Sequence, residues 1–301
     1  MAKYLAVDIG GTNIKYALMN GEAEILEQGT VPTPQTDFDE FLNAVGEIYD
    51  RYADEIEAIA MSAPGRIDAD KGYFYTSGAL RYIAPRDMTE VMKERCPVDF
   101  CMENDAKAAA LAELWKGSMQ GIENGIVMTL GTGIGGAVII NGKLYRGTTF
   151  AAGEFSGIST AWNSTYDEKD AWCERESTRG LVARYAEVRG LNEEEVTGRT
   201  FFDSVHAGEP EALQVLDEFC TGLATGLYSL QLALDVQKVA IGGGISKQPE
   251  LIEGINRKMT ELFAGQPHTP AAQPEIVSCT FGNDANLIGA LYHYLYEFKK
   301  A

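Results

Sequence analysis

Four glycine-rich elements are candidates for holding phosphate groups. They are residues 10–11, 131–136, 242–244 and 282, and each follows an apolar stretch with the pattern of a strand. Glycine lets backbone N–H groups approach phosphate oxygens, because no Cβ stands in the way. One such element is weak support for a phosphate site, whereas four in this order favour a nucleotide-binding protein.

The first element has charged residues on both sides. Asp8 stands at the end of the strand and can bind Mg²⁺, usually through water. Lys15 is placed to reach a terminal phosphate. A plain hairpin with a solvated aspartate fits the same short pattern, so this element alone leaves both interpretations open.

Two common phosphate-binding motifs do not fit the chain. It contains no G-x-x-x-x-G-K-[ST] run. The glycines at 131, 133 and 136 match the dinucleotide motif by their letters, but residues 137–140 are expected to return as a strand. Because the dinucleotide motif needs a helix there, we reject it.

Asp105 is the candidate general base. It lies in Glu103-Asn104-Asp105-Ala106, between an expected strand end and an expected helix start. Phosphoryl transfer to a hydroxyl needs positioning, charge neutralisation and an acceptor for the proton. The spacing is equally typical of a helix cap made by Asn104 or Asp105.

The elements around these residues form a pattern that occurs twice. We expect strands at 3–7, 14–19 and 23–30, a helix at 38–52, a strand at 56–61 and a helix at 106–115. Strands at 125–130, 137–140 and 143–145 restart the pattern, followed by helices at 212–234 and 249–263, strands at 238–241 and 276–279, and a closing helix at 285–296. Residues 156–178 read as a long loop. Two related α/β halves are the predicted architecture.

Composition excludes several classes of function. The chain has 301 residues, enough for two domains, and a net charge of −19, which argues against nucleic acid and anionic membranes as partners. It has no run of 18 apolar residues and no signal-peptide pattern. Its five cysteines are scattered, which is typical of reduced thiols in the cytoplasm.

The motifs together resemble the repressor/open-reading-frame/kinase (ROK) family of sugar kinases over the whole chain. The matching stretches are LAVDIGGTNIKYAL, MSAPGRID, ENDAKAAALAE, LGTGIGGAVIINGKLYRG, AAGEF and VAIGGGIS. The segments SAPGRID, SGALR, AGEF and GNDANLIGALYH are most similar to zinc-less β-glucoside kinases. The resemblance implies an actin-like, hexokinase-like (ribonuclease H-like) α/β fold of two domains with a cleft between them, and transfer of the γ-phosphate of ATP, with Mg²⁺, to the 6-hydroxyl of a hexose or β-glucoside.

The resemblance also implies roles for individual residues. Asp105 would be the base, and Asp8 the Mg²⁺ site. The sugar would contact Gly65, Gly78, Ala79, Asn104, Asp105, Glu154 and Glu174. ATP would contact Gly10, Gly11, Thr12, Asn13, Lys15, Thr132, Gly133, Gly243 and Gly244.

The chain departs from the family where most members hold zinc. Gly157 stands where the family has a histidine, and between residues 153 and 181 the only cysteine is Cys173, with no histidine. A tetrahedral Cys₃His site cannot be assembled there, so we predict no structural zinc. We expect packing by Trp162 and Trp172 to hold this loop instead. The late sugar-binding glutamate is Glu174 or Glu176, and we favour Glu174.

The missing imidazole also bears on the substrate. A pocket enlarged at Gly157 would admit a β-linked disaccharide, because losing a hydrogen-bonding partner relaxes or shifts specificity. Equally, Gly157 could allow a different loop path while a free hexose stays the substrate, as in glucokinases, fructokinases or N-acetylmannosamine kinases.

Two other classes of function fit the sequence less well. A sugar-sensing repressor would need an N-terminal helix-turn-helix module, for which the phosphate motif at Asp8 leaves no room. A non-catalytic sugar-binding protein would have no need for Asp8, Lys15 and Asp105.

We expect a small domain of residues 1–117 plus 285–301 and a large domain of residues 118–284. The family resemblance implies a homodimer.

Overall fold

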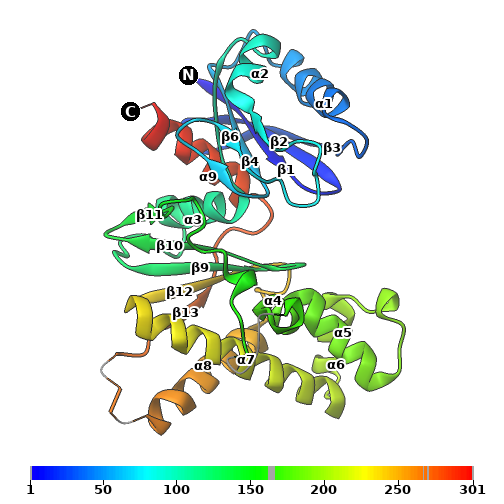
Figure 1. Ribbon diagram of the computed structural model, residues 1–301, viewed down its shortest axis with the longest axis vertical. Helices are drawn as coiled ribbons and strands as arrows, with labels where there is room; N and C mark the ends of the chain where they lie inside the picture. The colour runs from blue at the N-terminus through cyan, green and yellow to red at the C-terminus, as the bar shows by residue number, and fades with distance from the viewer. Residues whose placement is uncertain (1, 162–166, 267, 270, 300–301) are drawn as a thin grey trace. The chain divides into compact units, whose positions relative to one another are not determined.

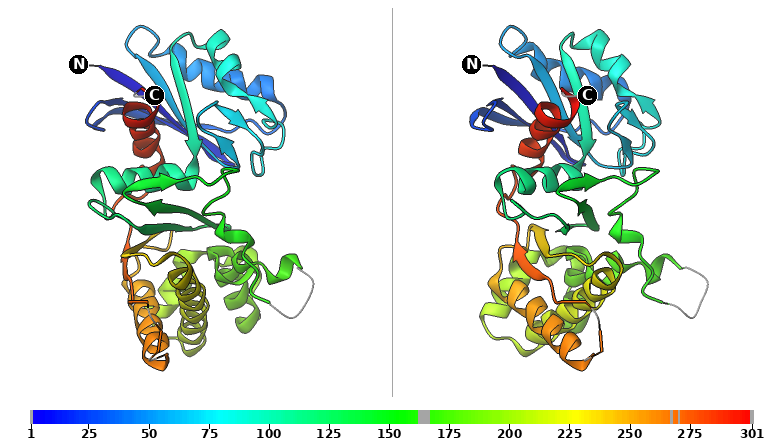
Figure 2. Two further views of the ribbon diagram at one scale, coloured as in Figure 1. Left: turned by 60° about the vertical axis from the view of Figure 1, so that its left-hand side comes forward. Right: turned by 90° about the vertical axis from the view of Figure 1, so that its left-hand side faces the viewer.

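Two five-stranded sheets dominate the structure, one in each of two units of the chain (Figures 1 and 2). The computed structural model describes residues 2–161, 167–266, 268–269 and 271–299. Unit 1 comprises Met1–Gly117, Gly147–Ala151 and Asn283–Ala301, and unit 2 comprises Ser118–Arg146 and Ala152–Gly282. Each unit is described by itself below.

The sheet of unit 1 combines a meander with two parallel strands. Its order is β3-β2-β1-β4-β8, with β1 (Lys3–Ile9), β2 (Asn13–Asn20) and β3 (Ile25–Pro32) antiparallel. Strands β4 (Ala58–Ala63) and β8 (Asp99–Asn104) run parallel to β1. The carboxyl ends of β1, β4 and β8 therefore lie at one edge of the sheet.

Helices cover both faces of this sheet. Apolar side chains of β1 at every second position, including Leu5 and Val7, pack in one core with α1 (Phe38–Asp50) and α2 (Met88–Arg95). The opposite face of β1 meets α9 (Ala285–Tyr292). Just after α9, the ring of Tyr294 packs on that of Tyr4 with centroids 5.5 Å apart. Helix α3 (Asp105–Lys116) packs beside α9, and residues His293–Phe298 extend α9 as a π-helical turn. A small antiparallel sheet is formed by β5 (Ile67–Asp68), β6 (Tyr73–Phe74) and β7 (Arg86–Asp87).

The sheet of unit 2 repeats the same plan. Its order is β11-β10-β9-β12-β13, in which β9 (Gly125–Leu130), β10 (Ile134–Ile140) and β11 (Lys143–Tyr145) are antiparallel. Strands β12 (Lys238–Gly243) and β13 (Glu275–Ser278) run parallel to β9. The main core of the unit lies between this sheet and α5 (Thr178–Arg189), α6 (Gly198–His206), α7 (Pro210–Leu234) and α8 (Pro249–Gly265).

The expected strands and helices are confirmed within a few residues, except in the segment 156–178. We expected a long loop there, but the structure has 3-10 turns at Phe155–Gly157 and Glu168–Asp170 and a short helix, α4 (Trp172–Glu176). Helix α4 forms because Trp172 and Glu176 pack against α7, a tertiary contact that the polar local sequence does not reveal. Trp172 is buried, and Trp162 lies outside the described residues.

Among the described residues, none of the helices has the length and hydropathy to cross a membrane.

Candidate functional site

Asp8 is a buried carboxylate at the carboxyl end of β1. Its side chain is held by two donors, the Ser62 hydroxyl at 3.1 Å and the Asn286 amide at 3.0 Å. Lys15 lies opposite Asp8 on β2, and Ser62 opposite it on β4. Burial raises the pKa of Asp8, and the hydrogen bonds from Asn286 and Ser62 and the charge of Lys15 offset part of that rise. A cation next to this carboxylate would relieve the cost of its burial.

The glycine-rich hairpin that follows is tight. Gly10 N–H donates to the Asn13 carbonyl over 2.9 Å, and a Cβ at Gly10 would lie 2.8 Å from the same oxygen. The backbone N–H of Thr33 donates to the Thr12 carbonyl over 2.9 Å and ties the hairpin to the chain after β3. Residues 11–13 are exposed, so their backbone is accessible to a ligand.

Asn104 and Asp105 begin helix α3 at the same edge of the sheet. Oδ1 of Asn104 accepts from the backbone N–H of Lys107 at 3.1 Å, so Asn104 is the helix cap. The Asn104 amide nitrogen donates to the Gly65 carbonyl at 3.0 Å and to Asp105 Oδ1 at 2.9 Å. Asp105 also accepts from the backbone N–H of Ala106 at 2.7 Å. These contacts fix the Asp105 carboxylate in the first turn of the helix.

Gly65 occupies a position that only glycine fits. Its φ is +108°, and a Cβ there would lie 2.1 Å from the Thr76 carbonyl oxygen. Gly78, with φ +59°, and Ala79 are exposed on the turn that follows Thr76. Gly65 and Asn104 are thus in direct contact. The Gly78-Ala79 turn begins two residues after Thr76, whose backbone packs against Gly65.

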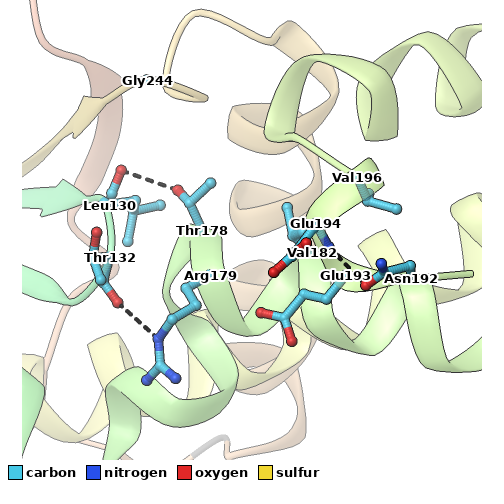
Figure 3. A pocket seen from close by; sticks show the side chains of 11 residues that line it. Leu130, Thr132, Thr178, Arg179, Val182, Asn192, Glu193, Glu194, Val196 and Gly244 are labelled. Atoms are coloured by element: carbon cyan, nitrogen blue, oxygen red, sulfur yellow. Dashed lines mark hydrogen bonds between the residues drawn. The ribbon is translucent and has the colours of Figure 1, made fainter.

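Unit 2 contains a pocket of about 780 Å³ (Figure 3). Thr132 and Gly244 line it, whereas Gly133 and Gly243 are not among its lining residues. Gly243 has φ +98°, and its backbone packs against Leu130, since a Cβ there would lie 2.2 Å from the Leu130 carbonyl oxygen. The remaining wall consists of Leu130, Gly131, Thr178, Arg179, Val182, Asn192, Glu193, Glu194 and Val196.

Most of that wall was missed from the sequence. Helix α5 begins under the glycine turn, where the Thr178 hydroxyl donates to the Leu130 carbonyl at 3.1 Å and Arg179 Nε to the Thr132 carbonyl at 3.5 Å. The acidic run Glu193–Glu195 is an exposed 3-10 turn, and Glu193 and Glu194 line the pocket. No motif in residues 178–196 points to a ligand, so only folding reveals their role.

The candidate sugar-binding glutamates of unit 2 differ in environment. Glu154 is exposed and directly precedes the 3-10 turn Phe155–Gly157. Glu174 is 38% exposed at its side chain and forms an ion pair with Arg179, which lines the pocket. Glu176 is buried, lies 3.6 Å from Arg184, and has a pKa raised by burial. Of the two alternatives, Glu174 is the more exposed, and its partner Arg179 lines the pocket.

Comparison with known proteins gives a consistent picture. The sequence profile of the ROK family matches residues 4–296. The β-glucoside kinase of Listeria monocytogenes is 33% identical over 98% of this chain and 98% of its own length. The glucokinase of Halalkalibacterium halodurans is 29% identical over 95% of this chain and 93% of its own. A crystal structure of a ROK family protein from Streptococcus pneumoniae in complex with sucrose has a TM-score of 0.89 at 29% identity, covering 99% of this chain and 100% of that one.

The matched region extends over both units and takes in each of the glycine-rich elements described above. The chain therefore belongs to the ROK family and has the actin-like, hexokinase-like fold of its sugar kinases.

Proposed function

We propose that this protein is an ATP-dependent sugar kinase that transfers the γ-phosphate to the 6-hydroxyl of a β-glucoside. Sugar phosphotransfer is supported by relatives named β-glucoside kinase and glucokinase that align over nearly the whole chain. The β-glucoside is the narrower part of the proposal, and free glucose is the alternative substrate.

One observation carries the proposal: two aspartates with different environments lie at the same edge of one sheet. Asp8 ends β1 as a buried carboxylate, and Asp105 follows β8 in the first turn of α3. Because β1, β4 and β8 are parallel neighbours, both acids lie at the carboxyl ends of the strands, where α/β sheets bind ligands. Phosphoryl transfer needs one acid for a metal ion and one for the proton.

Asp8 fits the expected Mg²⁺ site. A carboxylate whose pKa is raised by burial gains from a nearby cation, and Mg²⁺ bound mainly to water needs only one or two such ligands. When bound, Mg²⁺ would neutralise charge that develops on the phosphate oxygens. Lys15, opposite Asp8 on β2, would add a positive charge to the same region.

Asp105 would orient the sugar hydroxyl and accept its proton. Its carboxylate is held by the Asn104 amide and by the backbone of Ala106, so its orientation is set before the sugar binds. The resulting sugar alkoxide oxygen attacks the γ-phosphorus as the bond to ADP breaks, and the proton stays on Asp105. The sugar would be positioned by Asn104, Gly65, Gly78, Ala79, Glu154 and Glu174.

The pocket of unit 2 would receive the nucleotide. Its volume is within the range of small-molecule sites, about 300–1,000 Å³. Leu130, Val182 and Val196 offer apolar surface for adenine, while Asn192 and Glu193 offer polar groups for the base or the ribose. Gly10, Gly11, Thr12, Asn13, Lys15, Thr132, Gly133, Gly243 and Gly244 would serve the phosphates.

Space at Gly157 supports the β-glucoside as substrate. A Cβ at this position would meet no atom within 4 Å among the described residues, so the region beside Glu154 is open.

From the resemblance to the ROK family we propose that the protein is a cytoplasmic homodimer. We also propose that no zinc holds the segment around Cys173, since its only sulfur ligand has no histidine partner nearby in sequence.

The test is an assay that couples ADP release to NADH oxidation, with Mg²⁺ and a sugar panel. The panel contains glucose, fructose, mannose, N-acetylmannosamine, cellobiose and gentiobiose. We expect sugar-dependent ADP release with the highest kcat/KM for a β-linked disaccharide. A higher kcat/KM for glucose would contradict the β-glucoside proposal, and no turnover on any of the sugars would contradict the proposal of a kinase for them.

A further inference from the structure

We infer that Arg66, Tyr75 and Phe150 form a subsite for the second ring, or aglycone, of a β-glucoside. These three side chains are called the aromatic stack below. The inference rests on the proposed function, because it assigns the part of the substrate that distinguishes a glucoside from free glucose. All three residues belong to unit 1.

The three side chains of the aromatic stack contact one another in series. The Arg66 guanidinium lies 4.5 Å from the centroid of the Tyr75 ring, and the Tyr75 and Phe150 rings are stacked with centroids 6.2 Å apart and an interplanar angle of 23°. Tyr73 braces Tyr75 by an edge contact at 5.1 Å. Together these groups make a rigid surface with aromatic and cationic character.

This surface is accessible. Tyr75 is 38% exposed, and Arg66 and Phe150 are partly exposed. Exposed tyrosine and phenylalanine rings that gather around an arginine are typical of binding surfaces, because they offer large apolar area together with polar donors.

Arg66 has donors available for a ligand. Within the described ranges its guanidinium makes the contact with Tyr75 but neither a hydrogen bond nor an ion pair. Arg95, by contrast, donates twice to Asp50, at 2.9 and 2.7 Å. Among the described residues, the Arg66 guanidinium has no ion-pair partner, so its donors are available to a ligand. Its five N–H groups suit sugar hydroxyls.

The aromatic stack begins one residue from the expected sugar site. Arg66 follows Gly65, whose carbonyl accepts from the Asn104 amide at 3.0 Å, and Tyr75 precedes Thr76, which packs against Gly65. Arg66 and Tyr75 directly flank β5 and β6, and Tyr75 N–H donates to the Arg66 carbonyl at 2.9 Å. The β5–β6 hairpin therefore ties the aromatic stack to the residue that contacts Asn104.

Phe150 shows a second sign of a ligand-binding role. Its φ is +62°, a left-handed conformation that is unfavourable for an aromatic residue. Such strained residues cluster at ligand sites, where the surrounding structure holds them in place. Phe150 also precedes Glu154, a proposed sugar ligand, by four residues in the chain.

A pyranose or aryl aglycone fits this chemistry. The C–H face of a sugar ring, or the ring of an aryl glucoside, would stack on the aromatic side chains, while the Arg66 N–H groups would donate to ring hydroxyls. Free glucose has no second ring and would not use the aromatic stack. The surface therefore supplies affinity for a glucoside only.

The test is titration calorimetry with glucose, cellobiose and phenyl β-glucoside, without ATP, on wild type and variants. We expect wild type to bind the two glucosides more tightly than glucose. Tyr75→Ala should weaken glucoside binding about fivefold to tenfold, the size of one aromatic contact, and leave glucose binding within about twofold. Tyr75→Phe should restore glucoside binding. Arg66→Ala should weaken the binding of cellobiose more than that of phenyl β-glucoside. Tyr145→Ala, at an exposed tyrosine outside the aromatic stack, should leave the binding of all three sugars unchanged.

The outcomes separate this inference from the proposed function. The aglycone subsite is refuted if Tyr75→Ala weakens the binding of glucose and of the glucosides equally, or weakens the binding of none of them. It is also refuted if wild type binds glucose as tightly as cellobiose. If the selective loss is found but no sugar supports ADP release, the subsite stands and the kinase proposal fails. Direct binding without ATP makes the two results independent.

Discussion

The side-chain amide of Asn286 donates a hydrogen bond to the Asp8 carboxylate over 3.0 Å, although 278 residues separate the two in the chain. Asn286 stands in the first turn of α9, and Asp8 ends the first strand. The last helix of the chain therefore completes the environment of the proposed metal ligand. This bond favours the ionised carboxylate in a place where burial opposes it.

Replacing Asp8 by Asn should separate function from stability. Asn keeps the shape of the side chain and removes the buried charge, so kcat should fall about 100-fold to 1,000-fold, the cost of losing one preorganised charge contact. The melting temperature without Mg²⁺ should not fall, and we expect it to rise. Activity assays and thermal unfolding with and without MgATP would measure both effects.

The pH dependence of that stability difference has a defined sign. The pKa of Asp8 is raised in the folded state, so folded protein holds the proton more tightly than unfolded protein does. Between the ordinary aspartate pKa of 3.8 and the raised pKa of Asp8, the stability of wild type falls as pH rises. Above that window the destabilisation is complete. The advantage of Asp8→Asn should thus be largest at neutral pH. A variant that is much less stable than wild type at neutral pH would contradict this account.

Much of the fold could be predicted because its signals are local. The apolar strands Lys3–Ile9 and Gly125–Leu130, each followed by glycines, indicate the two related sheets. The small sheet β5–β7 could not be predicted, since its two-residue strands carry no periodic pattern. Helix α4 depends on Trp172 meeting Gly226 of α7 and on Glu176 meeting Gly222, which are contacts between distant segments of the chain.

The candidate site divides in the same way. Asp8, Asn104 and Asp105 stand at ends of predicted strands and helices, so their positions followed from the pattern. Arg179 lies in the first turn of a helix without any motif, and only the folded chain places it beside the pocket. Asn286 belongs to the stretch GNDANLIGALYH, but its contact with Asp8 appears only in the folded chain.

Packing between α4 and α7 should hold the segment around Cys173, for which we predict no structural zinc. A Cβ at Gly226 would lie 2.1 Å from Cζ2 of Trp172, which is buried. Gly226→Ala should therefore lower the free energy of unfolding by about 1–3 kcal/mol, a typical cost of overpacking. Gly265→Ala is the matched control, because a Cβ there meets nothing within 4 Å of it and alanine favours helix. Equal stability of both variants in urea unfolding would show that this packing does not hold α4.

Glu174 and Glu176 can be told apart by paired substitutions. Glu174→Gln should raise the KM for the sugar about tenfold or more, the effect of weakening a hydrogen bond to a charged group. Glu176→Gln should leave that KM unchanged, because its side chain is buried between Arg184 and α7. Its effect should appear in the melting temperature instead. A sugar KM raised by Glu176→Gln alone would reverse the assignment.

Asp105→Asn tests the base directly. An asparagine at this position can still accept from the Asn104 amide and the Ala106 N–H through Oδ1, so the start of α3 should keep its geometry. It cannot accept the sugar proton, so kcat should fall about 100-fold to 10,000-fold, the usual contribution of a general base. Sugar affinity, measured by calorimetry without ATP, should stay within about tenfold of wild type, because a single neutral hydrogen bond contributes only about 0.5–1.5 kcal/mol. Asn104→Ala is the informative comparison: it removes the cap of α3 and the bond to Gly65, and should lower both affinity and stability. Turnover retained by Asp105→Asn would mean that another group accepts the proton.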